Sequence, residues 1–276
     1  MRKGRGGGCA VDRLFKVHLG LVYAFLYAPI LVLMVLSFNK AGLPTVWTGV
    51  STEWYAALLD RPDILRAARN SLIVALMSTV LATVIGTLLA LGVERRRASA
   101  AVDALLFAPM IIPDVVLAIA LLSFFTLLNF TLGLHSIIMA HVVFNIAFVC
   151  AVVRARLRSF DWSLTEVSAD LGAKGLTTFL RITLPLIAPA IFAAALLAFT
   201  LSLDEFIIAY FTAGAGQSST TLPMKIYAMI RFGVTPEINA MATIVMLVSF
   251  VLVLGSQRLD RGALASRRLE RAAGTG

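Results

Sequence analysis

The chain alternates between long apolar runs and short polar segments. Six runs stand out, and they cover residues 19–38, 72–93, 104–128, 132–153, 187–209 and 238–255. Their lengths match the roughly 20 residues that an α-helix needs to cross about 30 Å of hydrocarbon. The runs are continuously apolar rather than alternating, which favours helices over the strands of a barrel. The pattern therefore predicts an all-α integral membrane protein with six transmembrane helices.

The composition excludes an ordinary soluble domain. Hydrophobic residues make up 59% of the chain and charged residues 14%, with a mean hydropathy of +0.91, whereas soluble domains are about 45–50% apolar and about 25% charged. We expect a basic cytoplasmic tail over residues 1–18, a six-span membrane domain over residues 19–256 and a second basic tail over residues 257–276. The two cysteines lie too far apart in sequence to indicate a disulfide framework or a metal site.

The distribution of lysine and arginine indicates which side each loop faces. Of the 24 such residues, 18 fall in segments that are cytoplasmic if the N-terminus is cytoplasmic, and six fall in the outer loops. Cytoplasmic loops of membrane proteins carry such an excess, so we expect both termini in the cytoplasm. The net charge of +9 is spread over short segments without interleaved aromatic residues. Nucleic acid is therefore not an expected partner.

The cytoplasmic segment 154–186, between the fourth and fifth runs, predicts a short helix. Ser163 and Glu166 have the spacing of a capping box, and Gly172 is placed to end the helix in a left-handed conformation. A mainly apolar stripe lies between these signals and consists of Leu164, Val167, Ser168 and Leu171. So short a helix is marginal alone and must pack against the span ends or a partner. An ordinary loop with a well-capped turn is the alternative.

This segment also resembles the EAA signature of ABC importer permeases, E-A-A-x3-G-x9-I-x-L-P. The matching residues are Glu166, Gly172, Ile182, Leu184 and Pro185, while Val167 and Ser168 replace the two alanines. Three later stretches, at residues 202–206, 221–227 and 233–244, resemble the C-terminal half of spermidine/putrescine permease subunits. The likeness extends over roughly residues 15–260. Related permeases for Fe(III) or organic phosphonates share parts of these stretches and are alternatives.

The resemblance implies a type I ABC importer permease fold in a bacterial inner membrane. In this family the EAA helix lies in a groove of the ATPase and transmits its closure to the spans. The residues to which the resemblance and the apolar stripe assign this coupling are Leu164, Glu166, Val167, Ser168, Leu171 and Gly172. The implied partners are a cytoplasmic ATPase dimer, a second homologous permease subunit, an extracytoplasmic solute-binding protein and the lipid bilayer. The outer loop 211–237 is a candidate for docking the binding protein.

The chain has no phosphate-binding loop of the form G-x-x-x-x-G-K-[ST]. We therefore expect a transporter subunit rather than an enzyme, with no cofactor of its own and with ATP and Mg on the partner ATPase. A proton-coupled secondary transporter is the alternative from another class, and it would need an ionisable relay inside the membrane. His135 and His141 differ in helical phase by about 240°, so hydrogen bonding between helices is the better interpretation for them and for Asn145.

Three acidic residues are candidates for the substrate pathway. Asp204 and Glu205 lie in the fifth run, where a charge facing lipid would cost about 2.5–3.5 kcal/mol, so they should face a cavity, a partner or an interface. Asp114 follows Pro113 in the third run, where proline frees backbone carbonyls. An anionic pair would suit a polyamine cation. Alternatively, the pair marks the outer headgroup boundary and Asp114 caps a broken helix.

Overall fold

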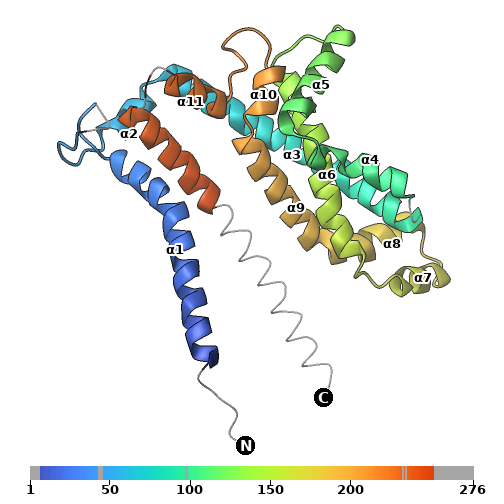
Figure 1. Cartoon of the computed structure of the whole chain (residues 1–276). Coiled ribbons are helices and arrows are strands. Elements are labelled where there is room, and N and C mark those ends of the chain that lie inside the picture. Colours follow the sequence, from blue (N-terminus) through green and yellow to red (C-terminus); the bar gives the residue numbers. More distant parts are fainter. Residues whose placement is uncertain (1–6, 43–45, 97–98, 232, 234, 252–276) are drawn as a thin grey trace, which may run out of the picture. The chain divides into compact units, whose positions relative to one another are not determined.

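The computed structural model describes residues 7–42, 46–96, 99–231, 233 and 235–251 (Figure 1). Regular structure in this part of the chain is helical, apart from one isolated bridge between Asn39 and Val50. The elements in order are α1 (Gly7–Leu36), α2 (Glu53–Leu59), α3 (Pro62–Arg96), α4 (Ala100–Ile111), α5 (Asp114–Leu127), α6 (Leu134–Leu157), α7 (Ser163–Asp170), α8 (Gly175–Thr178), the π-helical turn η1 (Phe179–Thr183), α9 (Leu184–Asp204), α10 (Ile207–Thr212) and α11 (Leu222–Ile230). A further apolar helix covers Pro236–Val251. The predicted all-α class is confirmed for the described residues.

Four of the described helical segments are long and apolar enough to cross a membrane. They cover Arg13–Leu36, Pro62–Arg95, Leu134–Leu157 and Gly175–Asp204. α4 and α5 qualify together and make a fifth span if the bent pair counts as one. The predicted run at 238–255 corresponds to the shorter helix Pro236–Val251, and its last residues lie outside the described part of the chain. The described residues thus support four or five spans where the apolar runs predicted six.

Two of the predicted runs are broken. The prediction of one continuous helix over residues 104–128 is wrong, because α4 and α5 meet at an angle of 106°. Ile112 and Pro113 between them are extended, with ψ angles of 134° and 136°. Proline has no N–H to donate and disfavours a helical conformation in the residue before it, so the helix must end here. The fifth run breaks after Asp204, where Glu205 is extended with a ψ of 122°.

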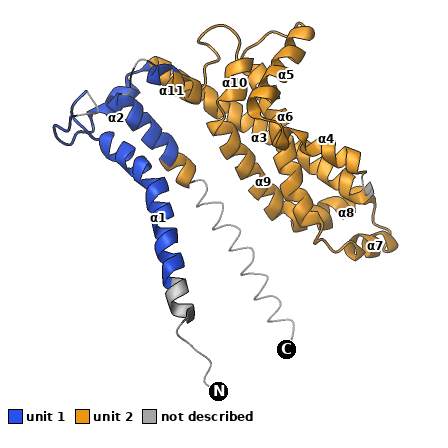
Figure 2. Ribbon diagram, in the orientation of Figure 1, with its two compact units in different colours: residues 1–61, 228–246 blue, residues 62–227, 247–276 orange. Residues whose placement is uncertain are grey.

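The chain divides into two compact units, which are described separately (Figure 2). The first comprises residues 1–61 and 228–246. Its outer loop is organised by the buried side chain of Asn39, whose Nδ2 donates to the carbonyl oxygen of Val46 at 2.8 Å. The indole Nε1 of Trp54 donates to the backbone carbonyl of Asn39, also at 2.8 Å. One buried amide therefore ties the loop after α1 to the start of α2.

The predicted tails are only partly described. α1 begins at Gly7, so the predicted basic tail of residues 1–18 continues as one helix into the first span from that residue. The second predicted tail, over residues 257–276, lies outside the described residues.

The second unit comprises residues 62–227 and 247–276, and α3, α6 and α9 form its core (Figures 1 and 2). Small residues allow these helices to approach closely. A Cβ atom added to Gly86 of α3 would lie 2.8 Å from the Cβ of Val149 on α6. The other small, fully buried residues of the same cluster include Ala82, Ala90, Cys150, Ala194 and Ala198. The core is therefore closed by side chains of one to three heavy atoms at these crossings.

A buried hydrogen-bond chain links the same three helices. His141 Nδ1 of α6 lies 2.7 Å from Ser202 Oγ of α9, and Ser202 Oγ lies 2.9 Å from Ser78 Oγ of α3. The prediction of hydrogen bonding between helices is confirmed for His141. It is wrong for Asn145, whose side-chain amide is buried on the same helix without a hydrogen-bond partner. His135 bonds locally instead, with its Nε2 2.7 Å from the backbone oxygen of Thr131, because it lies in the first turn of α6 rather than on its buried face.

An ion-pair cluster joins α3, α4 and α6 at the other end of the core. Arg154 on α6 is 8% exposed and forms two hydrogen bonds with Asp103 of α4, at 2.6 and 3.1 Å. Its Nε donates to Glu94 of α3 at 3.0 Å. Such bidentate, charge-assisted contacts are among the stronger polar interactions in proteins. In the sequence, Arg154 was only one of the basic residues predicted to be cytoplasmic, and nothing indicated its two acidic partners.

The substitution Gly86→Ala should lower the thermal stability of the detergent-solubilised protein. The added methyl group would overlap Val149, and overpacking of this kind typically costs about 1–3 kcal/mol. Gly92→Ala on the same helix is the matched control, because its Cβ would meet nothing within 4 Å. A helical Gly→Ala change without a clash is neutral or stabilising. Equal melting temperatures for the two variants would contradict the close approach of α3 and α6.

The substitution Arg154→Met should destabilise the fold by about 3 kcal/mol, because it leaves two partly buried carboxylates facing each other without their shared cation. The measurement is a thermal or denaturant melt of the purified protein. Arg158→Met, one turn further on and exposed, is the control and should change stability by less than about 0.5 kcal/mol. Removal of all three charges together should cost less than Arg154→Met alone, and the opposite order would refute the account.

Candidate functional site

The helix α7, which the charge pattern predicts to be cytoplasmic, begins where the sequence predicted, but it is capped differently. Ser163 is its first helical residue, and no side-chain cap bond is made at the N-cap position, Trp162. The predicted capping box between Ser163 and Glu166 is therefore wrong. Asp161 lies two residues upstream and its Oδ1 accepts a hydrogen bond from the amide of Ser163 at 3.0 Å, which supplies the same need. Hydrogen bonds from the side chain and backbone of Ser163 lower the pKa of Asp161.

The end of α7 confirms the prediction for Gly172. Its φ is +79°, in the left-handed region that favours glycine. The amide of Gly172 donates to the carbonyl of Ala169 at 2.8 Å, and the amide of Ala173 donates to that of Ser168 at 3.0 Å. These two bonds form a Schellman motif, which ends the helix and turns the chain towards α8.

The apolar stripe of α7 separates into an inner and an outer part. Ser168 is buried, and its Oγ lies 2.9 Å from Oγ1 of Thr178 on α8. Leu164, Val167 and Leu171 are 43%, 55% and 84% exposed. One polar contact thus holds α7 against α8, while three apolar side chains are left on the surface.

α8, η1 and α9 follow one another without an interruption. α8 covers the four residues Gly175–Thr178. The five residues of η1 form a π-helical turn, a feature that is often found at functional positions inside longer helices. α8 and η1 are therefore the direct N-terminal extension of the spanning helix α9.

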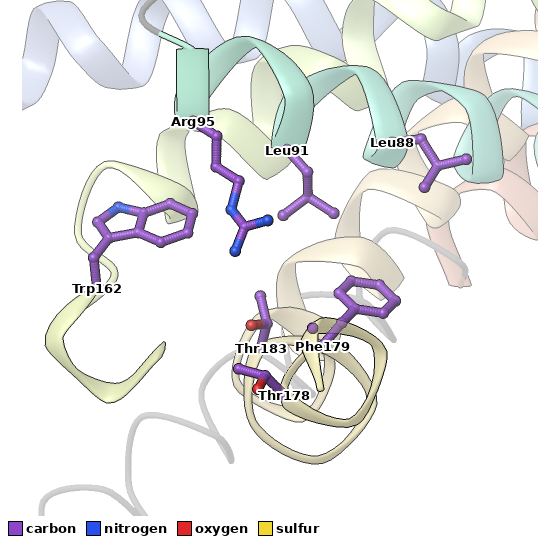
Figure 3. A pocket seen from close by; sticks show the side chains of 8 residues that line it. Leu88, Leu91, Arg95, Trp162, Thr178, Phe179 and Thr183 are labelled. Atoms are coloured by element: carbon purple, nitrogen blue, oxygen red, sulfur yellow. The ribbon is translucent and has the colours of Figure 1, made fainter. Parts of the chain in front are cut away.

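A pocket of about 170 Å³ lies between α3 and this extension (Figure 3). Arg95, at the end of α3, reaches into it, and its guanidinium carbon lies 5.9 Å from the centre of the Trp162 ring. The lining residues are Leu88, Leu91, Arg95, Trp162, Gly175, Thr178, Phe179 and Thr183. The extension formed by α8 and η1 is thus less tightly packed on α3 than α6 and α9 are in the core. Nothing in the spacing of these residues pointed to a pocket.

The three candidate pathway acids lie at the two helix breaks. Asp114 is the first residue of α5, Asp204 is the last of α9, and Glu205 occupies the break before α10. Glu205 is partly buried, and its Oε1 accepts a hydrogen bond from the amide of Ile208 at 2.8 Å. α5, which begins at Asp114, packs against α10, which begins two residues after Glu205. Asp204 is exposed next to the same break.

The break between α9 and α10 is anchored on both sides by α6. Before it, Ser202 is held by His141. After it, Ser136 Oγ donates to the carbonyl oxygen of Thr212 at 2.7 Å. Both anchors are buried, so the backbone around Glu205 has little freedom to move. Sequence reasoning missed these anchors, because a serine in an apolar run does not indicate its partner.

The outer loop after α10 is ordered by α3. Asn70 is buried, and its Nδ2 donates to the backbone oxygens of Ser218 and Thr220 at 2.8 and 2.9 Å. The amide of Leu222 donates to Ser71 Oγ at 2.8 Å. This part of the loop predicted for docking is therefore tethered to the N-terminal part of α3.

Among the residues that the structure describes, no three His, Cys, Asp or Glu side chains are grouped as a metal site would require.

The extension formed by α8 and η1 lies at one end of α9, and Asp204 and Glu205 lie at the other end. That helix has 21 residues, so the two sites are separated by about 30 Å at a rise of 1.5 Å per residue. Any action of one site on the other must pass along α9 or through the helices packed against it.

Comparisons with known proteins identify the family of the chain. Residues 82–262 match the family of binding-protein-dependent transport system inner membrane components. The spermidine/putrescine transport system permease protein PotC of Escherichia coli is 42% identical over 242 residues, which cover 87% of this chain and 91% of that protein. The putrescine transport system permease protein PotI of Escherichia coli is 43% identical over 239 residues, covering 83% and 84%.

Solved structures agree on the fold. A bacterial ABC transporter involved in the import of alginate has a chain with a TM-score of 0.72 and 18% identity, covering 91% of this chain and 96% of that one. A chain of the MetNI methionine ABC transporter has a TM-score of 0.57 and 16% identity, covering 77% and 99%. With the matched family model and the close relatives, they identify this chain as a permease subunit of the inner membrane, a member of the binding-protein-dependent transport system inner membrane components.

Proposed function

We propose that this chain is one of two permease subunits in an ATP-driven importer of polyamines such as spermidine and putrescine. The observation that carries the proposal is the identity of 42–43% to polyamine permeases over more than four fifths of the chain. The acids at the helix breaks support a cationic substrate, because an organic phosphonate would be repelled by them. Six spans with both termini in the cytoplasm agree with the charge distribution, and four or five of these spans are present among the described helices.

The coupling role belongs to α7. Its exposed Leu164, Val167 and Leu171 form a small apolar patch on a capped helix, which suits a groove on a cytoplasmic ATPase that carries ATP and Mg. Glu166 is exposed on the same helix and offers a charge to that partner. Gly172 fixes the direction in which the chain leaves the helix. A displacement of α7 passes through the contact between Ser168 and Thr178 into α8 and then into α9.

The substrate side belongs to the two helix breaks. Asp114, Asp204 and Glu205 offer negative charge where α4–α5 and α9–α10 are interrupted, and transporters commonly place ion and substrate sites at such interruptions. The loop that α3 tethers through Asn70 is the surface on which an extracytoplasmic binding protein would deliver the solute. The second, homologous permease subunit would complete the pathway.

The substitution Gly172→Val should reduce polyamine uptake by at least tenfold while polyamine-independent ATP hydrolysis persists. A β-branched residue is strongly disfavoured at a φ of +79°, so α7 would lose its C-terminal motif and its orientation on the ATPase. Gly175→Val is the matched control, since both sites are open to an added Cβ and only Gly172 has a positive φ. The coupling assignment fails if uptake by the Gly172 variant equals that of the control in proteoliposomes containing the whole complex.

The substitutions Glu205→Gln and Asp114→Asn should each lower polyamine uptake by about tenfold, because each removes a charge and keeps the shape of the side chain. In the Glu205→Gln variant the side-chain amide oxygen can still accept the bond from Ile208, which isolates the effect of charge. Asp60→Asn, at the end of α2, is the control and should retain normal uptake. Full uptake by both variants would remove the support for a charged pathway.

Uptake that stops on collapse of the proton gradient, with the ATPase intact, would favour a secondary transporter.

A further inference from the structure

We propose that Phe206, Tyr210 and Tyr227 form, with Glu205, an aromatic and carboxylate site for a linear organic ammonium ion at the break between α9 and α10. The proposal rests on the proposed function for the identity of the cation, and it assigns recognition to three side chains that the charge pattern did not single out. The relevant residues all lie in the second compact unit.

The three rings form one cluster. The ring centre of Phe206 lies 4.6 Å from that of Tyr227 and 5.5 Å from that of Tyr210, and the two tyrosine rings are 6.3 Å apart. Tyr210 and Tyr227 are nevertheless 50% and 42% exposed. The cluster is thus partly exposed rather than buried. A cation within about 6 Å of such a face is attracted by the ring quadrupole.

The cluster is adjacent to negative charge from two sources. Phe206 directly follows Glu205, and Asp204 precedes both. α9 ends at this position, and the C-terminal end of a helix carries partial negative charge on its carbonyl groups. Lys225, the basic residue on α11 near Tyr227, is paired with Asp63 at 2.8 Å, so its charge is already compensated. The local field therefore favours a cation beside the rings.

The site is held in place before any ligand arrives. Ser202 is bonded to both His141 and Ser78, which fixes the last turn of α9. Ser136 Oγ on α6 donates to the carbonyl oxygen of Thr212 at 2.7 Å, which holds the end of α10. A site supported by buried hydrogen bonds in this way loses little entropy when it binds a ligand.

The chemistry selects an alkylammonium ion over an inorganic cation. Aromatic faces can cover the methylene groups next to an ammonium group, while a carboxylate of Glu205 accepts its N–H groups. Asp114 is the first residue of α5, which packs against α10, and it offers a second negative charge for a second ammonium group of the same molecule. A hydrated metal ion would gain nothing from the methylene contacts.

The test uses the complete transport complex in proteoliposomes, with the binding protein saturated by labelled spermidine. Tyr210→Leu and Tyr227→Leu keep an apolar side chain but remove the aromatic face, whereas Tyr210→Phe and Tyr227→Phe keep the face and remove the hydroxyl. We expect each Leu variant to lower the initial uptake rate about tenfold, and each Phe variant to stay within twofold of the original. Tyr23→Leu, in the exposed ring pair of α1, is the control and should transport normally.

The outcomes separate this inference from the proposed function. Unchanged uptake in the Leu variants, or equal loss in the Leu and Phe variants, would overturn the aromatic site, the second because the hydroxyl groups would then be responsible. Co-purification of the ATPase with each variant shows that the complex has assembled, and the comparison between Leu and Phe holds at equal assembly. Failure of the unmodified complex to transport spermidine, with transport of another solute, would instead refute the proposed function.

Discussion

The close packing of α3 against α6 and α9 is the constraint on which the second unit depends. Gly86 and the buried alanines let the helix axes approach, and only at that separation can short side chains bond across three helices. Serine and histidine at these positions would otherwise remain unpaired in an apolar interior, where an unsatisfied polar group costs about 1–3 kcal/mol. The same contacts fix Ser202, two residues before α9 ends. The position of the helix break is therefore determined by the packing of the core.

α9 gives this packing a mechanical consequence. Its outer end is bonded to α3 and α6 through Ser202, while its inner end continues through η1 and α8 to the contact with α7. The pocket beside Arg95 and Trp162 leaves the inner end less confined than the outer end. A helix cannot be compressed along its axis, so a displacement of α7 would tilt or rotate α9 about its fixed outer part.

The sequence specified much of this arrangement because its strongest signals are local. Apolar length predicted the spanning helices, and the need for a left-handed residue predicted the end of α7 at Gly172. Sequence reasoning failed where the outcome depended on partners distant in the chain. The cap of α7 comes from Asp161 rather than Ser163, the run at 104–128 is bent, and Arg154 is shared between α3 and α4. No local pattern shows that Tyr227 lies against Phe206.

Under the proposed function, the exposure of the aromatic and acidic groups gives the second subunit a role in recognition. A cation beside an exposed ring gains only about 0.5–1 kcal/mol, and about 2 kcal/mol or more once water is excluded. Charge interactions strengthen in the same way as the surroundings become less polar. Tyr210, Tyr227 and Asp204 are all open on this chain alone. Closure of a partner over these side chains would therefore tighten binding of the cation, and withdrawal of the partner would weaken it. The pathway would then hold the cation when it closes and release it when it opens.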